Sequence, residues 1–142
     1  MLFDILTQNV NSKINVAQVR IARPTDKLNE IKKFYGEGLG LPILSSFENH
    51  KGYSGVMFGL PGSEYHLEFT HHQNGSPCPA PTKDNLLVFY ITDKKELENL
   101  AGRIFSMGYK SVEPENPYWE EKGVTIEDPD CWRIVLMNTR GI

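Results

Sequence analysis

Two residues near the middle of the chain have side chains suited to acid–base chemistry or to binding a metal ion. His66 and Glu68 lie two positions apart in the segment Tyr65 to His71, whose alternation is typical of a β-strand. Strand alternation places the two side chains on one face, about 7 Å apart. Histidine titrates near neutral pH, and a neighbouring carboxylate can orient it. The pair is therefore a candidate acid–base pair or half of a metal site, and the alternative is that both residues only line a wet cavity.

Two arginines could face the same cavity. Arg20 lies in the alternating segment 17–23, and Arg133 lies in the apolar segment 132–137. A guanidinium group binds carboxylates and phosphates through two hydrogen bonds, so both residues could hold an anionic ligand. The alternative role is a salt bridge with Glu68, because a buried carboxylate needs a partner.

Three aromatic side chains are candidates for stacking on a planar or apolar ligand. Tyr90 lies in an apolar run, and Tyr118 and Trp119 follow Pro117 in a loop that could border the cavity. Aromatic side chains more often simply pack in the interior, so packing is the alternative role for all three.

The segments that carry these residues follow one pattern twice. In the first half we predict a strand, a helix that starts at Asp26, and three strands, at residues 17–23, 26–38, 41–48, 53–60 and 65–71. In the second half the predicted order is the same, with the helix starting at Asp93 and capped by Gly108, at residues 85–92, 93–108, 109–112, 124–127 and 132–137. Each half therefore reads βαβββ.

This repeat predicts one α+β domain made of two modules. Module one covers residues 17–72 and module two covers residues 85–139, with a proline-containing linker at 73–84. One module alone would leave a sheet face uncovered, so we expect the two to pair around a cavity bounded by curved mixed sheets. The arm at residues 1–15 has no clear period, and either a short helix or a segment that packs on a partner subunit fits it.

Composition excludes several classes of function. The 142 residues carry a net charge of −3, without the basic excess that nucleic-acid binding requires. No apolar run approaches the roughly 20 residues of a membrane-spanning helix, and no basic-then-apolar signal opens the sequence, so we expect a cytoplasmic protein. Cys78 and Cys131 lack the spacing of a metal site and are expected to be reduced thiols.

Two short motifs resemble those of the vicinal oxygen chelate superfamily. The predicted strand and the helix that starts at Asp26, with Phe34-Tyr35 and then Gly38 to Leu41, resemble the first module of that superfamily. The segment Glu127 to Cys131 resembles its Asp-Pro-Asp-Gly turn, with cysteine in place of glycine. The resemblance spans residues 17–139 and implies a glyoxalase-like fold. The superfamily includes glyoxalases, extradiol dioxygenases, fosfomycin-modifying enzymes and bleomycin-sequestering proteins that use no catalytic metal.

The resemblance implies metal ligands on the first and fourth strands of each module. In module one these positions are Gln18 or Arg20 on the first strand and Glu68 on the fourth, with His66 on the same face. Arginine cannot ligate a metal because it is permanently cationic, so Gln18, His66 and Glu68 are the credible ligands.

The corresponding positions in module two argue against a metal site. They are Asn85 or Leu86 and Val135, and neither leucine nor valine offers a lone pair. A catalytic divalent ion normally has at least three protein ligands, all of which would come from module one here. We therefore expect no cofactor, and a divalent metal remains the alternative.

We expect a protein that binds a small anionic or aromatic molecule in the cavity between the modules. The alternative is a metal-dependent lyase, isomerase or dioxygenase, with its ion held by Gln18, His66 and Glu68 and its site completed by a second subunit of a homodimer. A third interpretation is a non-enzymatic interaction module that uses residues 1–15 and the exposed sheet edges.

Overall fold

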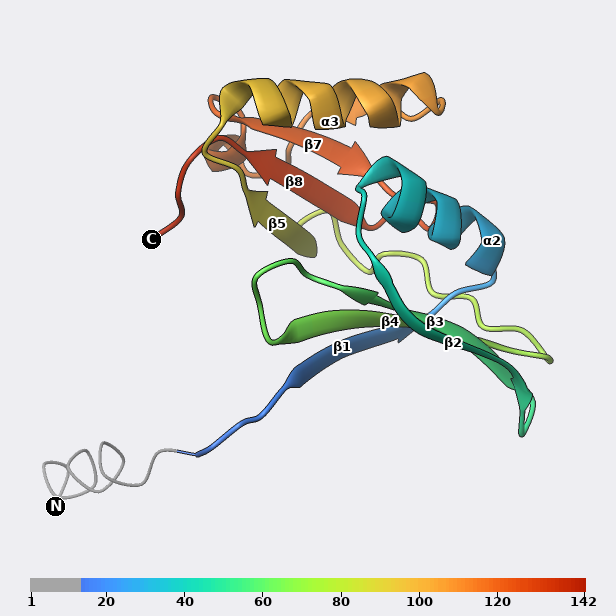
Figure 1. Cartoon of the computed structure of the whole chain (residues 1–142). Helices are drawn as coiled ribbons and strands as arrows, with labels where there is room; N and C mark the ends of the chain where they lie inside the picture. The colour runs from blue at the N-terminus through green and yellow to red at the C-terminus, as the bar shows by residue number, and fades with distance from the viewer. Residues whose placement is uncertain (1–13) are drawn as a thin grey trace, which may run out of the picture.

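The computed structural model describes residues 14–142, which form two four-stranded sheets and the helices that pack on them (Figure 1). The predicted arm at residues 1–15 lies outside the described residues except for its last two. In the described part of the chain, no helix is long and apolar enough to cross a membrane.

The first sheet has the strand order β1-β4-β3-β2. Its strands are β1 (Val19–Pro24), β2 (Ile43–His50), β3 (Tyr53–Gly59) and β4 (Tyr65–His72). β1 runs parallel to β4, whereas β3 is antiparallel to both of its neighbours. Leu67 and Phe69 of β4 are buried against the helices, so alternation turns His66 and Glu68 to the opposite face.

The first helix changes its geometry along its length. A short α2 (Leu28–Ile31) leads directly into the π-helix η1 (Lys32–Gly38), where the N–H of Leu39 donates to the carbonyl of Phe34 over 2.9 Å. Phe34 and Tyr35 are adjacent in the sequence and both are buried. π-Helical turns often occur at functional sites, and Tyr35 borders the cavity described below.

The predicted N-cap of this helix was wrong. The helix begins after Lys27, and no side chain caps it. The carboxylate of Asp26 instead accepts a hydrogen bond from the N–H of Ser76 in the linker and lies 3.4 Å from Nδ1 of His71. A tertiary contact therefore replaces the local cap.

Module two repeats the order of module one. Its elements are β5 (Leu86–Tyr90), α3 (Lys94–Ser106), β6 (Ser111–Val112), the 3₁₀ helix η2 (Pro117–Trp119), β7 (Gly123–Glu127) and β8 (Arg133–Met137), with the strand order β5-β8-β7-β6. Asp93 is the predicted N-cap, and its carboxylate accepts from the N–H groups of Lys95 and Glu96. Gly108 has the positive φ of +101° expected after a helix end.

One apolar core joins the modules. It contains residues of both helices and of both sheets: Ile31, Phe34, Val56, Phe58, Leu67, Phe69, Leu97, Ala101, Ile104, Ile126, Ile134 and Leu136. Figure 1 shows α3 along one face of the second sheet, and Nε of Arg103 in this helix donates to the carbonyl of Gly38 over 2.8 Å. The predicted α+β fold of paired modules is confirmed.

Candidate functional site

An arginine lies between the two residues singled out for acid–base or metal chemistry. Arg20 of β1 is directly opposite His66 of β4 in the sheet register. Its Nε donates to Nε2 of His66 over 2.8 Å, and its terminal nitrogen lies 3.6 Å from a carboxylate oxygen of Glu68. The predicted ion pair between Arg20 and Glu68 is therefore present. We call Arg20, His66 and Glu68 the sheet-face cluster.

The hydrogen bond from Arg20 determines which nitrogen of His66 carries the proton. A guanidinium group can only donate, so Nε2 of His66 must accept and the ring proton lies on Nδ1. His66 is 4% exposed, and its Nδ1 has no hydrogen-bond partner among the described residues. Nε2 of His66 is therefore committed to Arg20, whereas the buried Nδ1–H has no acceptor in the part of the chain that the structure describes.

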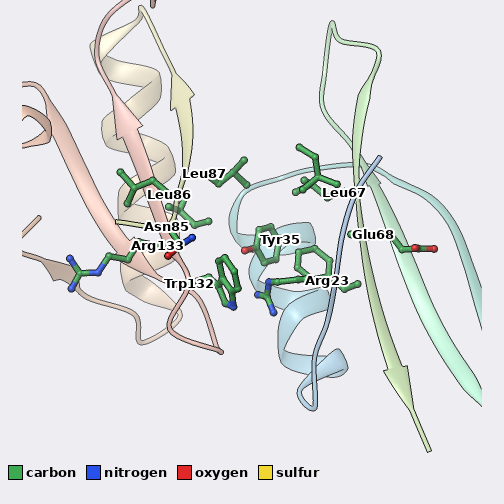
Figure 2. A pocket seen from close by; sticks show the side chains of 13 residues that line it. Arg23, Tyr35, Leu67, Glu68, Asn85, Leu86, Leu87, Trp132 and Arg133 are labelled. Atoms are coloured by element: carbon green, nitrogen blue, oxygen red, sulfur yellow. The ribbon is translucent and has the colours of Figure 1, made fainter. Parts of the chain in front are cut away.

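A separate cavity lies between the two modules. It has a volume of about 270 Å³, and its walls come from β1, β4 and the first helix on one side and from β5 and β8 on the other. The lining residues are mainly apolar: Ile21, Ala22, Arg23, Tyr35, Leu67, Glu68, Phe69, Asn85, Leu86, Leu87, Trp132, Arg133 and Ile134. Figure 2 shows Leu67 and Leu87 on opposite sides of this inter-module cavity.

Arg23 joins the modules at this cavity. It extends from β1 to the turn between β7 and β8, where its terminal nitrogens lie 2.5 Å from Asp128 and 2.8 Å from Asp130. The hydroxyl of Tyr35 donates to Asp128 over 2.6 Å, and that of Thr25 donates to Asp130 over 2.6 Å. Two carboxylates thus surround one guanidinium group, which leaves no uncompensated positive charge here.

Burial and charge change the pKa values of these groups. Burial raises the pKa of Tyr35 well above 10.0, and the negative charge of Asp128 adds to this rise. Burial also raises the pKa of Asp128, while the attraction of Arg23 opposes that rise. For Arg23, burial lowers the pKa, but Asp128 and Asp130 outweigh it and the pKa is raised overall. Arg23 therefore remains charged.

Two aromatic rings contact the guanidinium group of Arg23. Its central carbon lies 4.9 Å from the ring centre of Phe69 and 5.2 Å from that of Trp132. The indole N–H of Trp132 donates to the carbonyl of Cys78 over 2.8 Å, which also fixes the linker to module two. Arg23 and Trp132 therefore form a wall to which both modules contribute.

The two arginines predicted to share a cavity do not do so. Figure 2 shows the charged ends of Glu68 and Arg133 pointing away from the inter-module cavity and from each other. Arg133 donates to Glu127 over 3.2 Å and to the carbonyl of Glu113 over 3.0 Å. Arg20 is absent from the cavity lining. Arg133 thus has the salt-bridge role that was its alternative, but with Glu127 rather than Glu68.

The three predicted aromatic residues also lie elsewhere. Tyr118 is 66% exposed, and its ring centre is 4.8 Å from that of Trp119. Tyr90 is partly exposed and lies against Gly141. None of the three lines the inter-module cavity.

Of the residues that line the cavity, the sequence analysis singled out Glu68 and Arg133 but missed Arg23 and Trp132. Tyr35 and Asp128 were noted only as parts of family motifs. One signal was available, since Arg23 is a charged residue on the core-facing side of an alternating strand. A charge in such a position requires a partner.

The paired βαβββ modules give this chain the fold seen in glyoxalases and fosfomycin resistance proteins. Glyoxalase I of Leishmania major has a TM-score of 0.68 at 19% identity, and the match covers 87% of each chain. Fosfomycin resistance protein FosX of Listeria monocytogenes, solved with Mn(II) and a dihydroxypropylphosphonic acid, has a TM-score of 0.64 at 16% identity, covering 89% of this chain and 94% of that one. At these identities the likeness concerns the fold alone.

A closer relationship is seen in the sequence. Residues 19–70 match the YycE-like N-terminal domain, and residues 84–138 match the YycE-like C-terminal domain. YycE of Bacillus subtilis is 56% identical over 131 residues, which cover 92% of this chain and 94% of that protein. The crystal structure of a B. subtilis YycE protein of unknown function, described as a candidate glyoxalase/fosfomycin resistance protein, has a TM-score of 0.88 and covers 92% of this chain and 96% of that one. The chain belongs to the YycE-like family.

The FosX structure of Listeria monocytogenes contains Mn(II). In the present chain, the residues expected to hold an ion do not fit one as they are arranged. The Nε2 lone pair of His66 accepts from Arg20, and the guanidinium charge of Arg20 lies beside Glu68. Gln18 precedes β1 and is exposed. Within residues 14–142, no three His, Cys, Asp or Glu side chains are grouped as a metal site.

Proposed function

We propose that this protein binds a compact, uncharged aromatic molecule in the inter-module cavity and uses no metal to do so. The observation that carries the proposal is the cavity itself, about 270 Å³ in volume and walled mainly by apolar side chains of both modules. An apolar cavity of about 150 Å³ can bind benzene, so this one suits a molecule with one or two rings.

The charges around the cavity favour an aromatic ligand over an anionic one. Arg23 is compensated by Asp128 and Asp130, and the charged ends of Glu68 and Arg133 point away. An anion would therefore meet no free cation, whereas a planar ring would meet Trp132 and Leu87. The likeness to glyoxalase/fosfomycin resistance proteins supports small-molecule binding as the general class.

A metal-dependent lyase, isomerase or dioxygenase is the competing function. It would require His66 and Glu68 to be free for an ion, and both contact Arg20. A protein-interaction module is a further alternative. Removing residues 1–15 and measuring the molecular mass would show whether that arm joins subunits.

The proposal includes a cytoplasmic homodimer. The absence of a membrane-spanning helix in the described residues agrees with this location. β1 and β5 are edge strands, so a second copy of the chain could pair with their free backbone groups. Sedimentation velocity of the wild type measures the oligomeric state directly, and a monomer would contradict the proposed dimer.

The proposed ligand site can be tested by filling the cavity. Leu87→Trp would place a larger side chain in the space, while Tyr90→Trp on the same strand adds an indole outside it. Indole and 2-naphthol serve as probes, and their binding to each protein is measured by isothermal titration calorimetry. Thermal shift then supplies a second readout for the tryptophan variants.

We expect both probes to bind the wild type and the Tyr90→Trp control, and to bind Leu87→Trp at least about ten-fold more weakly, which is about 1.4 kcal/mol. Equal binding to Leu87→Trp and the control would contradict the proposed site, as would the absence of any probe binding to the wild type.

A further inference from the structure

The sheet-face cluster contains a permanent cation at the position where a metal ion would need to lie. Arg20 contacts both candidate ligands at once, with its Nε at 2.8 Å from Nε2 of His66 and a terminal nitrogen at 3.6 Å from Glu68. Its other terminal nitrogen lies 3.5 Å from the sulfur of Met57. One side chain therefore occupies the space between the groups that could donate to an ion.

Two physical effects then oppose a divalent ion. The lone pair of His66 is already used by a donor that cannot lose its proton, because arginine stays charged throughout the accessible pH range. The guanidinium charge would also repel a second cation placed between His66 and Glu68. The carboxylate of Glu68 is mostly buried but the Arg20 side chain is 48% exposed, so solvent weakens this repulsion without removing it.

We infer that Arg20 keeps this sheet face free of metal, because its guanidinium group contacts His66 and Glu68 in place of an ion. The inference rests on the metal-free part of the proposed function and identifies the residue responsible for it. If Arg20 lost its charge, His66 and Glu68 would become available to a divalent ion, with Gln18 as a further oxygen donor at the start of β1.

The test compares variants that differ in charge and in ligand number at one position. Arg20→Lys keeps a cation, Arg20→Ala removes it, and Arg20→His removes it while adding an imidazole opposite His66 in the sheet register. Each full-length protein is stripped with chelator, checked for its fold by circular dichroism, and titrated with Zn²⁺ or Ni²⁺ by calorimetry. Metal analysis after gel filtration gives the stoichiometry.

We expect the wild type and Arg20→Lys to bind no stoichiometric metal. Arg20→Ala should bind at least about ten-fold more tightly than the wild type, because the repulsion is gone. Arg20→His should bind one ion per chain, since it offers three protein ligands. A Glu68→Gln change in the Arg20→His protein should weaken that binding again, which would place the ion at this cluster.

Two results would overturn the inference. One is that folded Arg20→Ala and Arg20→His proteins bind no more metal than the wild type, which would show that something other than Arg20 excludes the ion. The other is tight stoichiometric metal in the wild type, which would also overturn the metal-free part of the proposed function. The wild-type measurement alone therefore distinguishes failure of the Arg20 inference from failure of the metal-free proposal.

Discussion

Arg23 makes the most direct polar connection between the modules, and we expect its removal to be costly. Arg23→Ala would leave Asp128 buried without its cation, and breaking a buried pair in this way typically costs about 3–5 kcal/mol. Urea unfolding at neutral pH measures the loss. Lys27→Ala is the matched control, because the exposed side chain of Lys27 donates to the carbonyl of Pro129 in the same turn and its removal should cost less than about 1 kcal/mol. Equal losses would contradict the role given to Arg23.

Tyr35 should make stability fall at alkaline pH. Its pKa in the folded protein is raised well above 10.0, so above about pH 10 the unfolded chain loses the phenolic proton while the folded chain retains it. The free energy of unfolding then decreases as pH rises, by up to about 1.4 kcal/mol per pH unit from this group.

Tyr35→Phe should remove this contribution while costing about 1 kcal/mol at neutral pH through the lost hydrogen bond to Asp128. Urea titrations at about pH 8 and about pH 11 compare the two proteins. Tyr109, whose pKa is also raised by burial, contributes a slope of the same sign in both. Identical slopes in the two proteins would show that Tyr35 is not protected from ionisation.

For individual residues, the sequence predicted the contacts that follow from strand alternation and missed the contact between residues far apart in the chain. The common face of His66 and Glu68 follows from a period of two, and the salt bridge of Arg20 follows from the need of a buried carboxylate for a partner. The contact of Arg23 with Asp128 joins residues 105 positions apart, and no local pattern encodes such a distance. The cavity depends on that contact and was predicted only in outline.

At the scale of elements, Gly123 permits the close approach of η2 to β7. A Cβ atom at Gly123 would lie 2.3 Å from the carbonyl oxygen of Trp119, so Gly123→Ala must displace the backbone of η2. We expect a loss of about 1–3 kcal/mol in the free energy of unfolding.

Gly102→Ala should instead increase stability, because the added Cβ meets no neighbour. Nothing lies within 4 Å of a Cβ at this exposed position within α3, so alanine should stabilise the helix by up to about 1 kcal/mol. Thermal unfolding of both variants tests the pair. A neutral effect of Gly123→Ala would mean that η2 is free to move away from β7.

The two predicted helix starts show how tertiary contacts override local signals. Asp93 and Asp26 both precede an amphipathic segment, but only Asp93 caps its helix. The carboxylate of Asp26 is used instead by the N–H of Ser76, which lies in the linker 50 positions away. The π-helix η1 likewise has no simple sequence signature. The order of strands and helices could be predicted, because residues on the buried face of each element recur with a fixed period.

At the scale of the whole molecule, a single core predicts a single unfolding transition. Apolar residues of both modules form one cluster, so neither module can lose its structure alone. Tryptophan fluorescence, which reports on module two, and far-ultraviolet circular dichroism, which reports on both, should give the same urea midpoint. A fragment of residues 1–72 should remain unfolded. Separate midpoints for the two signals would contradict the single core.

The central claim is that this YycE-like protein holds a small organic molecule between its modules without a metal ion. Native mass spectrometry of the full chain, purified without chelator and combined with elemental analysis, measures both parts at once. The account predicts an organic adduct that leaves on denaturation, is absent from Leu87→Trp, and is accompanied by no stoichiometric metal. One divalent ion per chain, retained until chelator is added, would contradict it.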